Sequence, residues 1–278
     1  MISIKEALSC ATTTLKPSSP SPKIEAEILL QYVLDKTRAF LYTHPEQLLL
    51  PAQQEQFDAL VGKRHDGHPV AYLTKQQEFW SLPLEVCDAT LIPRADTERL
   101  VEVALTLIHS DHANILELGT GSGAIALALA SEKPHWKIHA GDICQNALQV
   151  AKKNAENLKI HNVSFSQTHW FSSFKNQTFD AILSNPPYIA EDDPHLTQGD
   201  LRYEPQQALT SGKEGLDALT ILIKNSAKHL RPGGFILLEH GYNQKTPVAN
   251  LLANNGFHKI RCWQDNQGID RVSGGFVY

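Results

Sequence analysis

From about residue 114 onward, short apolar runs alternate with stretches of helical periodicity. The strand-like runs are Asn114–Leu118, Lys137–Ala140, Val163–Ser166, Phe179–Leu183 and Phe235–Glu239, and the helix-like stretches are Ala124–Ala130, Ala147–Leu158, Leu216–Leu230 and Val248–Asn254. Repeated strand–helix units favour an α/β fold with a mostly parallel sheet covered on both faces. Two last strand-like runs, His258–Trp263 and Arg271–Tyr278, follow without a helix between them, which predicts an antiparallel hairpin at the sheet edge.

The residues before position 75 have a different character. Helical spacing of apolar residues predicts a small helical domain, with Ser3 capping its first helix and a proline-rich loop at 16–22 separating it from the next. Residues 78–92 alternate in polarity around Pro83 and predict a hairpin or linker strand pair. We therefore predict three parts, 1–74, 75–92 and 93–278.

Composition excludes several classes of protein. No run approaches the roughly 20 apolar residues that a membrane span needs, and the N-terminal residues lack a secretory pattern. The four cysteines lie far apart without a Cys-x-x-Cys pair, which argues against a zinc ribbon or a disulfide scaffold and favours the cytoplasm. A net charge of −5 offers no bulk attraction to nucleic acid.

A glycine-rich loop follows the first strand-like run. Gly119, Thr120, Gly121, Ser122 and Gly123 stand between the strand and a helix. Glycine permits positive φ and close approach of a ligand, and the helix N-terminus offers free N–H groups, so a nucleotide-like cofactor is predicted. The loop also satisfies the dinucleotide pattern, and a tight turn without a ligand is the plain alternative.

Asp142 ends the next strand-like run. A carboxylate at that place can accept hydrogen bonds from both hydroxyls of a ribose. The alternative is a helix cap for the segment that starts near Gln145.

The segment Asn185-Pro186-Pro187-Tyr188 ends another apolar run. Prolines stop the strand, so Asn185 is expected near the glycine loop at the carboxyl edge of the sheet. The Asn185 side-chain carbonyl and the Pro186 backbone carbonyl could accept both N–H bonds of a planar –NH2 group, and Tyr188 adds an aromatic face. None of these residues is a strong base or nucleophile, which suits a transfer driven by positioning. A proline-terminated turn with a locally bonded Asn is the alternative.

The glycine loop, Asp142 and the Asn-Pro-Pro-Tyr segment resemble S-adenosylmethionine-dependent methyltransferases that modify amino groups. Three further stretches, residues 91–98, 202–209 and 212–216, together with the helical N-terminal region, resemble the HemK-type family of release factor glutamine methyltransferases. The resemblance extends over essentially the whole chain. One departure is Ala95, where the family usually has proline.

The resemblance implies a class I S-adenosylmethionine-dependent methyltransferase fold, a doubly wound and mostly parallel seven-stranded sheet with a small N-terminal helical, substrate-binding domain. The implied substrate is the glutamine of the Gly-Gly-Gln loop in class I peptide chain release factors, and the implied products are a methylated amide nitrogen and S-adenosylhomocysteine. The loop from Gly119 to Gly123 would hold the methionine part, Asp142 the ribose, and Trp170 the adenine side. Asn185 and Pro186 would be the catalytic pair that binds the amide, Asn185 also facing the cofactor, while Pro187 and Tyr188 shape the pocket.

Rival interpretations remain at this point. One alternative is methylation of glutamine in a protein other than a release factor. A methyltransferase acting on the exocyclic amine of adenine or guanine could also use the same pocket, but it needs a basic path for the nucleic acid, and residues 1–72 contain no long Lys/Arg run. The glycine pattern alone permits a dinucleotide-dependent oxidoreductase, and a non-catalytic cofactor-binding module is a third possibility. The clusters His65–His68 and His109–His112 lack a third ligand of clear spacing, so no metal site is predicted. We expect a monomer that acts on a protein partner, without stable nucleic-acid or membrane binding.

Overall fold

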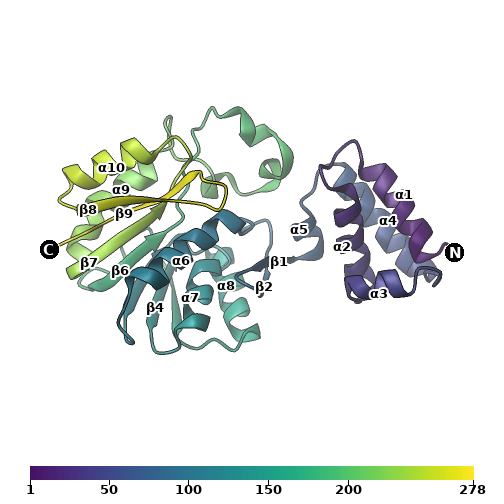
Figure 1. The fold of residues 1–278 in the computed structure, drawn as a ribbon, viewed down its shortest axis with the longest axis horizontal. Helices are drawn as coiled ribbons and strands as arrows, with labels where there is room; N and C mark the ends of the chain where they lie inside the picture. The colour runs from purple at the N-terminus through teal and green to yellow at the C-terminus, as the bar shows by residue number, and fades with distance from the viewer. The chain divides into compact units, whose positions relative to one another are not determined.

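The structure is a computed structural model that describes residues 1–278. The chain forms two compact units (Figure 1). The helical unit comprises Met1–Gln76 and His195–Tyr203, and the sheet unit comprises Gln77–Pro194 and Glu204–Tyr278. The three parts predicted from the sequence stay a prediction, and the structure adds that residues 195–203 pack with the helical unit.

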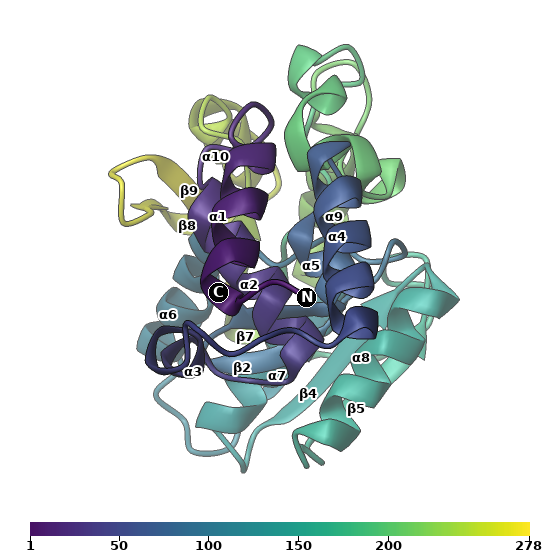
Figure 2. The same cartoon turned by 90° about the vertical axis from the view of Figure 1, so that its right-hand side faces the viewer.

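Five helices build most of the helical unit (Figure 2): α1 (Ile4–Leu15), α2 (Pro22–Leu34), α3 (Arg38–Thr43), α4 (Pro51–His65) and α5 (Val70–Thr74). Their apolar faces form one core, which includes Ile4, Leu15, Leu29, Leu30 and Phe57. The predicted cap is confirmed, because the Glu6 N–H donates to Ser3 Oγ over 3.3 Å and the Ser3 N–H donates to Glu6 over 2.8 Å. This capping box satisfies donors that the first turn leaves unpaired.

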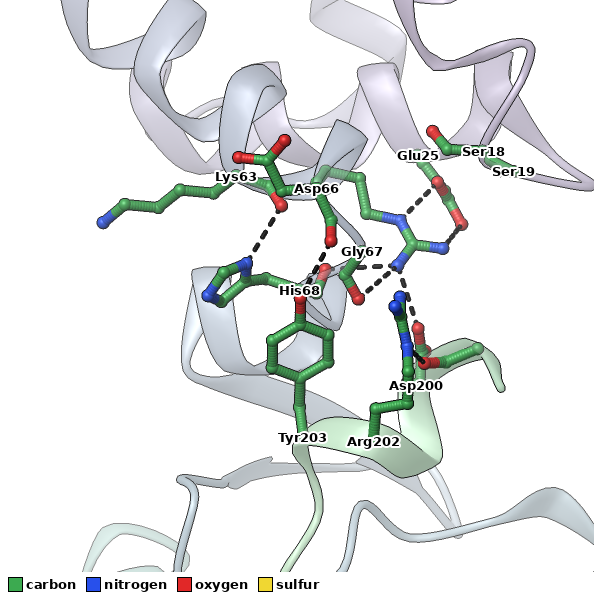
Figure 3. A network of polar contacts seen from close by, with 12 residues as sticks. Ser18, Ser19, Glu25, Lys63, Asp66, Gly67, His68, Asp200, Arg202 and Tyr203 are labelled. Carbon is green, nitrogen blue, oxygen red and sulfur yellow. Dashed lines mark hydrogen bonds and ion pairs between the residues drawn. The ribbon is translucent and has the colours of Figure 1, made fainter. Parts of the chain in front are cut away.

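Two short 3-10 helices, η2 (Pro194–Thr197) and η3 (Gly199–Tyr203), bring a later part of the chain into the helical unit. The buried Arg64 guanidinium donates to Glu25 of α2 over 2.8 Å and to Asp200 of η3 over 2.9 Å, and both acceptors are labelled in Figure 3. The Tyr203 hydroxyl donates to the Asp66 carbonyl over 2.8 Å, and its ring lies against His68. A buried cation thus joins segments 136 residues apart.

The sheet unit contains a seven-stranded sheet in the order β5-β4-β3-β6-β7-β9-β8. Its strands are β3 (Asn114–Leu118), β4 (Lys137–Asp142), β5 (Val163–Gln167), β6 (Phe179–Ser184), β7 (Leu230–Glu239), β8 (His258–Gln264) and β9 (Asp270–Phe276). The first five are parallel, and β9 pairs antiparallel with both β7 and β8. The predicted mostly parallel sheet and its terminal antiparallel hairpin are confirmed.

Helices cover both faces of this sheet (Figure 1). The helices α6 (Glu98–Leu107), α7 (Ala124–Glu132) and α8 (Gln145–Asn157) pack on the face that carries Ile115. The helices α9 (Asp217–Ser226) and α10 (Lys245–Asn254) pack on the opposite face, which carries Leu116. Because successive strand residues point to opposite faces, a continuous apolar strand is buried on both sides.

A hairpin opens the sheet unit. Its strands β1 (Gln76–Phe79) and β2 (Leu82–Glu85) are joined by Trp80 and Ser81, which both have positive φ. Such backbone angles match the tight turn of a two-residue hairpin. Two hydrogen bonds hold Trp80 there, one from its N–H to Glu98 and one from its indole to Glu132, both over 2.8 Å. The predicted strand pair is confirmed, although β1 begins at Gln76, two residues before the range 78–92.

Two helical expectations differ from the structure. The helix predicted over Leu216–Leu230 ends at Ser226, because a 3-10 turn, η5 (Ala227–His229), leads directly into β7 at Leu230. Residues 231–234 lie outside the strand predicted over Phe235–Glu239, yet they belong to β7, which has a register shift against β6 at this place. Helix α6 was not predicted, and η1 (Ala95–Thr97) and η4 (Gln206–Ala208) complete the elements. No helix combines the length and apolar character needed to cross a membrane.

Arg64 gives the helical unit a sharp test. Replacing Arg64 by Ala leaves the partly buried Glu25 carboxylate without its cation, so we expect the free energy of unfolding to fall by about 3 kcal/mol. Urea unfolding followed by circular dichroism measures the change. The exposed neighbour Lys63→Ala is the control and should leave the unfolding curve in place. Equal curves for the two variants would show that the Arg64 ion pairs contribute nothing.

Candidate active site

A cavity of about 270 Å³ lies at the carboxyl ends of β3, β4 and β6, within the sheet unit. Most of the predicted site residues line it, namely Gly119, Thr120, Gly121, Ser122, Asp142, Trp170, Asn185 and Pro187. The other three, Gly123, Pro186 and Tyr188, do not line it. The structure therefore brings the glycine loop, the carboxylate and the asparagine to one place.

Strand pairing explains why these segments meet. Strands β3 and β6 are parallel neighbours with Glu117 opposite Leu183, so their carboxyl ends lie side by side. The Ser184 hydroxyl donates to the Leu118 carbonyl over 2.6 Å and ties the two ends together. Ligands of open α/β sheets bind beyond such ends.

The glycine loop has the backbone shape that only glycine adopts easily. Gly119, Gly121 and Gly123 have φ of 76°, 56° and 87°. A Cβ on Gly123 would meet Leu127 at 3.1 Å and Ala151 at 3.2 Å, whereas one on Gly121 would meet nothing within 4 Å. Gly123 therefore serves packing at the start of α7, and Gly121 faces open space beside the cavity.

Asp142 fixes this loop. One carboxylate oxygen accepts from the Gly121 N–H over 2.8 Å and the other from the Cys144 N–H over 2.9 Å. Burial raises the pKa of Asp142, although the N–H groups of Cys144, Gly121 and Ile143 act in the opposite direction. Helix α8 begins with Cys144 as its N-cap and has no side-chain cap bond, so Asp142 does not cap it as the alternative proposed.

Trp170 follows β5 and lines the cavity with a left-handed backbone, φ 51°. Its carbonyl accepts the Thr168 hydroxyl over 2.8 Å, which holds the tight turn. A bulky residue in this conformation carries backbone strain. The Trp170 ring is partly buried against the apolar core on the sheet face that α9 and α10 cover.

The Asn-Pro-Pro-Tyr segment leaves β6 with its residues in different environments. The Asn185 side chain donates through Nδ2 to Thr97 Oγ1 over 3.1 Å, and its Oδ1 accepts no hydrogen bond within the protein. Pro186 is buried and Pro187 is partly exposed at the cavity. The Tyr188 hydroxyl donates to Glu239 over 3.1 Å, so its ring packs in the core and not at the cavity wall.

Some lining residues were not singled out from the sequence, including Arg94, Thr97, Glu117 and Gln207. Glu117 carries a usable signal, a lone carboxylate within an apolar strand that runs into glycines. Glu239 carries the same signal at the end of β7. No three His, Cys, Asp or Glu side chains converge in a way that could hold a metal ion.

Glu117 is almost completely buried below the glycine loop. Its carboxylate accepts the Thr120 hydroxyl over 2.7 Å and the Ala126 N–H over 3.1 Å, which joins β3, the loop and α7. Burial raises the pKa of Glu117 to about 7 against the effect of these two donors.

Comparison with known proteins decides the family. Residues 6–74 match the family described as the PrmC N-terminal domain, and residues 97–270 match the methyltransferase small domain. The release factor glutamine methyltransferase of Shewanella oneidensis is 47% identical over 98% of this chain and 95% of its own length. That of Escherichia coli is 46% identical over 94% of both chains.

The chain belongs to the family of release factor glutamine methyltransferases. Its sheet unit has the class I methyltransferase fold of that family. A solved structure with this fold is the 16S rRNA N2 G1207 methyltransferase of T. thermophilus, in complex with AdoMet and guanosine. It is 16% identical, has a TM-score of 0.53, and covers 73% of this chain and 50% of its own. The family resemblance drawn from the sequence is thus confirmed.

Glu117 predicts a dependence of stability on pH. Its folded pKa near 7 lies above the ordinary 4.5, so between these values the folded protein holds a proton that the unfolded chain has lost. The contribution of Glu117 to the free energy of unfolding therefore falls as pH rises through this window. Glu117→Gln, which can still accept both hydrogen bonds, should lose less stability than wild type between about pH 5 and 8.

Urea unfolding at both pH values measures this difference. Glu156→Gln, at an exposed position of α8, is the control and should follow the wild-type pH dependence. A Glu117→Gln protein with the wild-type dependence would show that Glu117 does not titrate in this range.

Proposed function

We propose that this protein transfers a methyl group from S-adenosylmethionine to the side-chain amide nitrogen of the glutamine in the Gly-Gly-Gln loop of class I peptide chain release factors. One observation carries the proposal: the Asn185 Oδ1 is unpaired at the wall of the cavity that the glycine loop also lines. The relatives named as release factor glutamine methyltransferases support the substrate class.

The residues of the cavity fit this cofactor. The open space beside Gly121 and the bare backbone from Gly119 to Gly123 suit the methionine part, and Trp170 offers an apolar wall for the adenine. Each Asp142 oxygen uses one lone pair on the backbone and keeps another for a ribose hydroxyl. When bound, S-adenosylmethionine supplies an electrophilic methyl group on a positively charged sulfur.

The protein's part in the reaction is to bind and orient the glutamine amide. An amide nitrogen is a weak nucleophile because its lone pair is delocalised into the carbonyl. The Asn185 Oδ1 and the Pro186 carbonyl, neither of which is paired within the protein, are the acceptors for the two N–H bonds. Accepting both bonds returns electron density to nitrogen and fixes its direction of attack, which is catalysis by positioning.

The rival of a nucleic-acid base as substrate is not favoured, because the full-length relatives act on release factors by name. The four cysteines form no disulfide, which suits a reducing compartment. We infer a monomeric enzyme that meets its protein substrate in the cytoplasm.

The substrate assignment is tested with labelled methyl groups. Incubating the protein and labelled S-adenosylmethionine with a release factor should label one glutamine, identified by mass mapping. A release factor with Ala in place of that glutamine should remain unlabelled. Equal labelling of both release factors would overturn the assignment.

Asn185 is tested by truncation. Asn185→Ala removes one of the two amide acceptors, so we expect kcat to fall about 10²–10³-fold. Calorimetric binding of S-adenosylhomocysteine should stay close to the wild-type value, because the glycine loop and Asp142 are intact. Asn250→Ala, at an exposed position of α10, is the matched control with unchanged turnover. Wild-type turnover by Asn185→Ala would remove Asn185 from the chemistry.

A further inference from the structure

Thr97 lies directly behind Asn185. It ends η1 at the start of α6 and is 4% exposed. Its hydroxyl oxygen accepts the hydrogen bond from Asn185 Nδ2 over 3.1 Å. An amide side chain can rotate by half a turn and exchange its oxygen and nitrogen, so this bond decides which of the two faces the cavity.

A hydroxyl has only one proton, and the direction of the Thr97 proton matters for this choice. If Thr97 donated to Asn185, the asparagine oxygen would turn toward Thr97 and its NH2 toward the cavity. The Glu239 carboxylate competes with Asn185 for this proton, because the Thr97 hydroxyl lowers the pKa of Glu239 as a nearby donor does. A Thr97 proton directed toward Glu239 leaves the Thr97 oxygen to accept from Asn185 Nδ2, which is the arrangement in the structure.

Glu239 is a buried carboxylate that can accept the Thr97 proton in a hydrogen bond. It ends β7, is 1% exposed, and receives the Tyr188 hydroxyl on Oε1 over 3.1 Å. Its Oε2 is buried and has no partner that meets hydrogen-bond geometry, so the Thr97 contact is looser than a full hydrogen bond in the free protein. Such bonds commonly tighten when substrate binds.

We propose that Thr97 and Glu239 are positioning residues that hold the Asn185 side chain with Oδ1 toward the substrate amide. The proposal rests on the function proposed above and deepens it. With the opposite orientation, the Asn185 NH2 would face the glutamine NH2, two donors without an acceptor between them. The site would then lose one of the bonds that orient the reacting nitrogen.

The charge state of Glu239 follows from its surroundings. Burial raises its pKa to about 7, while the Thr97 and Tyr188 hydroxyls and Arg271 lower it and Asp96 raises it. Arg271 is itself shared with Asp96 and Asp265, both at 3.3 Å. Below this pKa a protonated Glu239 can donate to Thr97, which frees the Thr97 proton for Asn185 Oδ1. We therefore expect the fraction of Asn185 with Oδ1 toward the cavity to fall as the pH falls through the pKa of Glu239.

Three substitutions of threonine separate positioning from folding. Thr97→Val keeps the shape but removes the hydroxyl, and we expect kcat to fall about 10–100-fold while KM for S-adenosylmethionine stays within about twofold. Thr97→Ser restores the hydroxyl and should restore most of kcat. Thr106→Val, a hydroxyl deletion at an exposed position of α6, which follows Thr97, is the control with wild-type kinetics.

Nuclear magnetic resonance of the Asn185 side-chain NH2 gives a readout that needs no substrate. Its protons should exchange slowly with water in wild type and in Thr97→Ser, and rapidly in Thr97→Val. Glu239→Gln should lower kcat and flatten its pH dependence near 7, because an amide does not titrate. Wild-type exchange and wild-type kcat in Thr97→Val would overturn the proposal.

The two proposals fail in different ways. A wild-type protein that methylates no release factor would count against the proposed function alone, since the Asn185 amide signals test the orientation directly. Active wild-type enzyme with an unchanged Thr97→Val variant would count against the positioning role alone. Thermal unfolding of each variant distinguishes a loss of activity from a loss of the folded structure.

Discussion

The site depends above all on the pairing of β3 with β6. Parallel neighbours end at the same edge of a sheet, and the register places Glu117 opposite Leu183. Two residues further on, the glycine loop and Asn185 leave the sheet together, tied by the bond from Ser184 to the Leu118 carbonyl. The space at Gly119, where another residue would carry Cβ, lies 3.9 Å from the Asn185 carbonyl oxygen. The glycine loop, proposed to hold the cofactor, and the loop proposed to bind the amide thus come from one pair of strands.

Several carboxyl groups lie at this edge of the sheet, and they mainly accept hydrogen bonds from groups of the protein itself. Asp142 is bonded to the backbone of the glycine loop, Glu117 to Thr120 and Ala126, and Glu239 to Tyr188. Burial favours their neutral forms and raises the pKa of each. The acceptor that we propose for the substrate amide, Asn185 Oδ1 beside the glycine loop, is by contrast uncharged. A neutral acceptor suits a neutral amide, and it explains how a chain of net charge −5 needs no basic surface for its chemistry.

Local sequence patterns predicted those features whose cause is local. The strand Asn114–Leu118, the Ser3 cap and the place of Asn185 follow from apolar runs, a capping residue and prolines, and the structure has each of them. Patterns failed where tertiary pairing overrides propensity, as at Pro232 and the following glycines. These residues lie in β7 at the register shift against β6, and Gly233 and Gly234 form backbone hydrogen bonds with Val277, which follows β9. Thr97 could be quoted as part of a motif, but its role depends on Asn185, 88 residues away in sequence. No local rule predicts such a contact.

The chain after Tyr188 is also placed by contacts between residues that lie far apart in the sequence. Backbone bonds from Ile189 to Leu209 and from Glu191 to Gly212 anchor it in the sheet unit before residues 195–203 join the helical unit. Arg64 fixes residues 195–203 in the helical unit through its hydrogen bond to Asp200. Separating a buried guanidinium from its carboxylate partners costs free energy, which stabilises this arrangement. The helical unit is therefore joined to the sheet unit at three points in the chain, after Gln76, Pro194 and Tyr203. The stretch of chain that leaves β6 at the cavity therefore continues, a few residues after Tyr188, into the segment that Arg64 fixes in the helical unit.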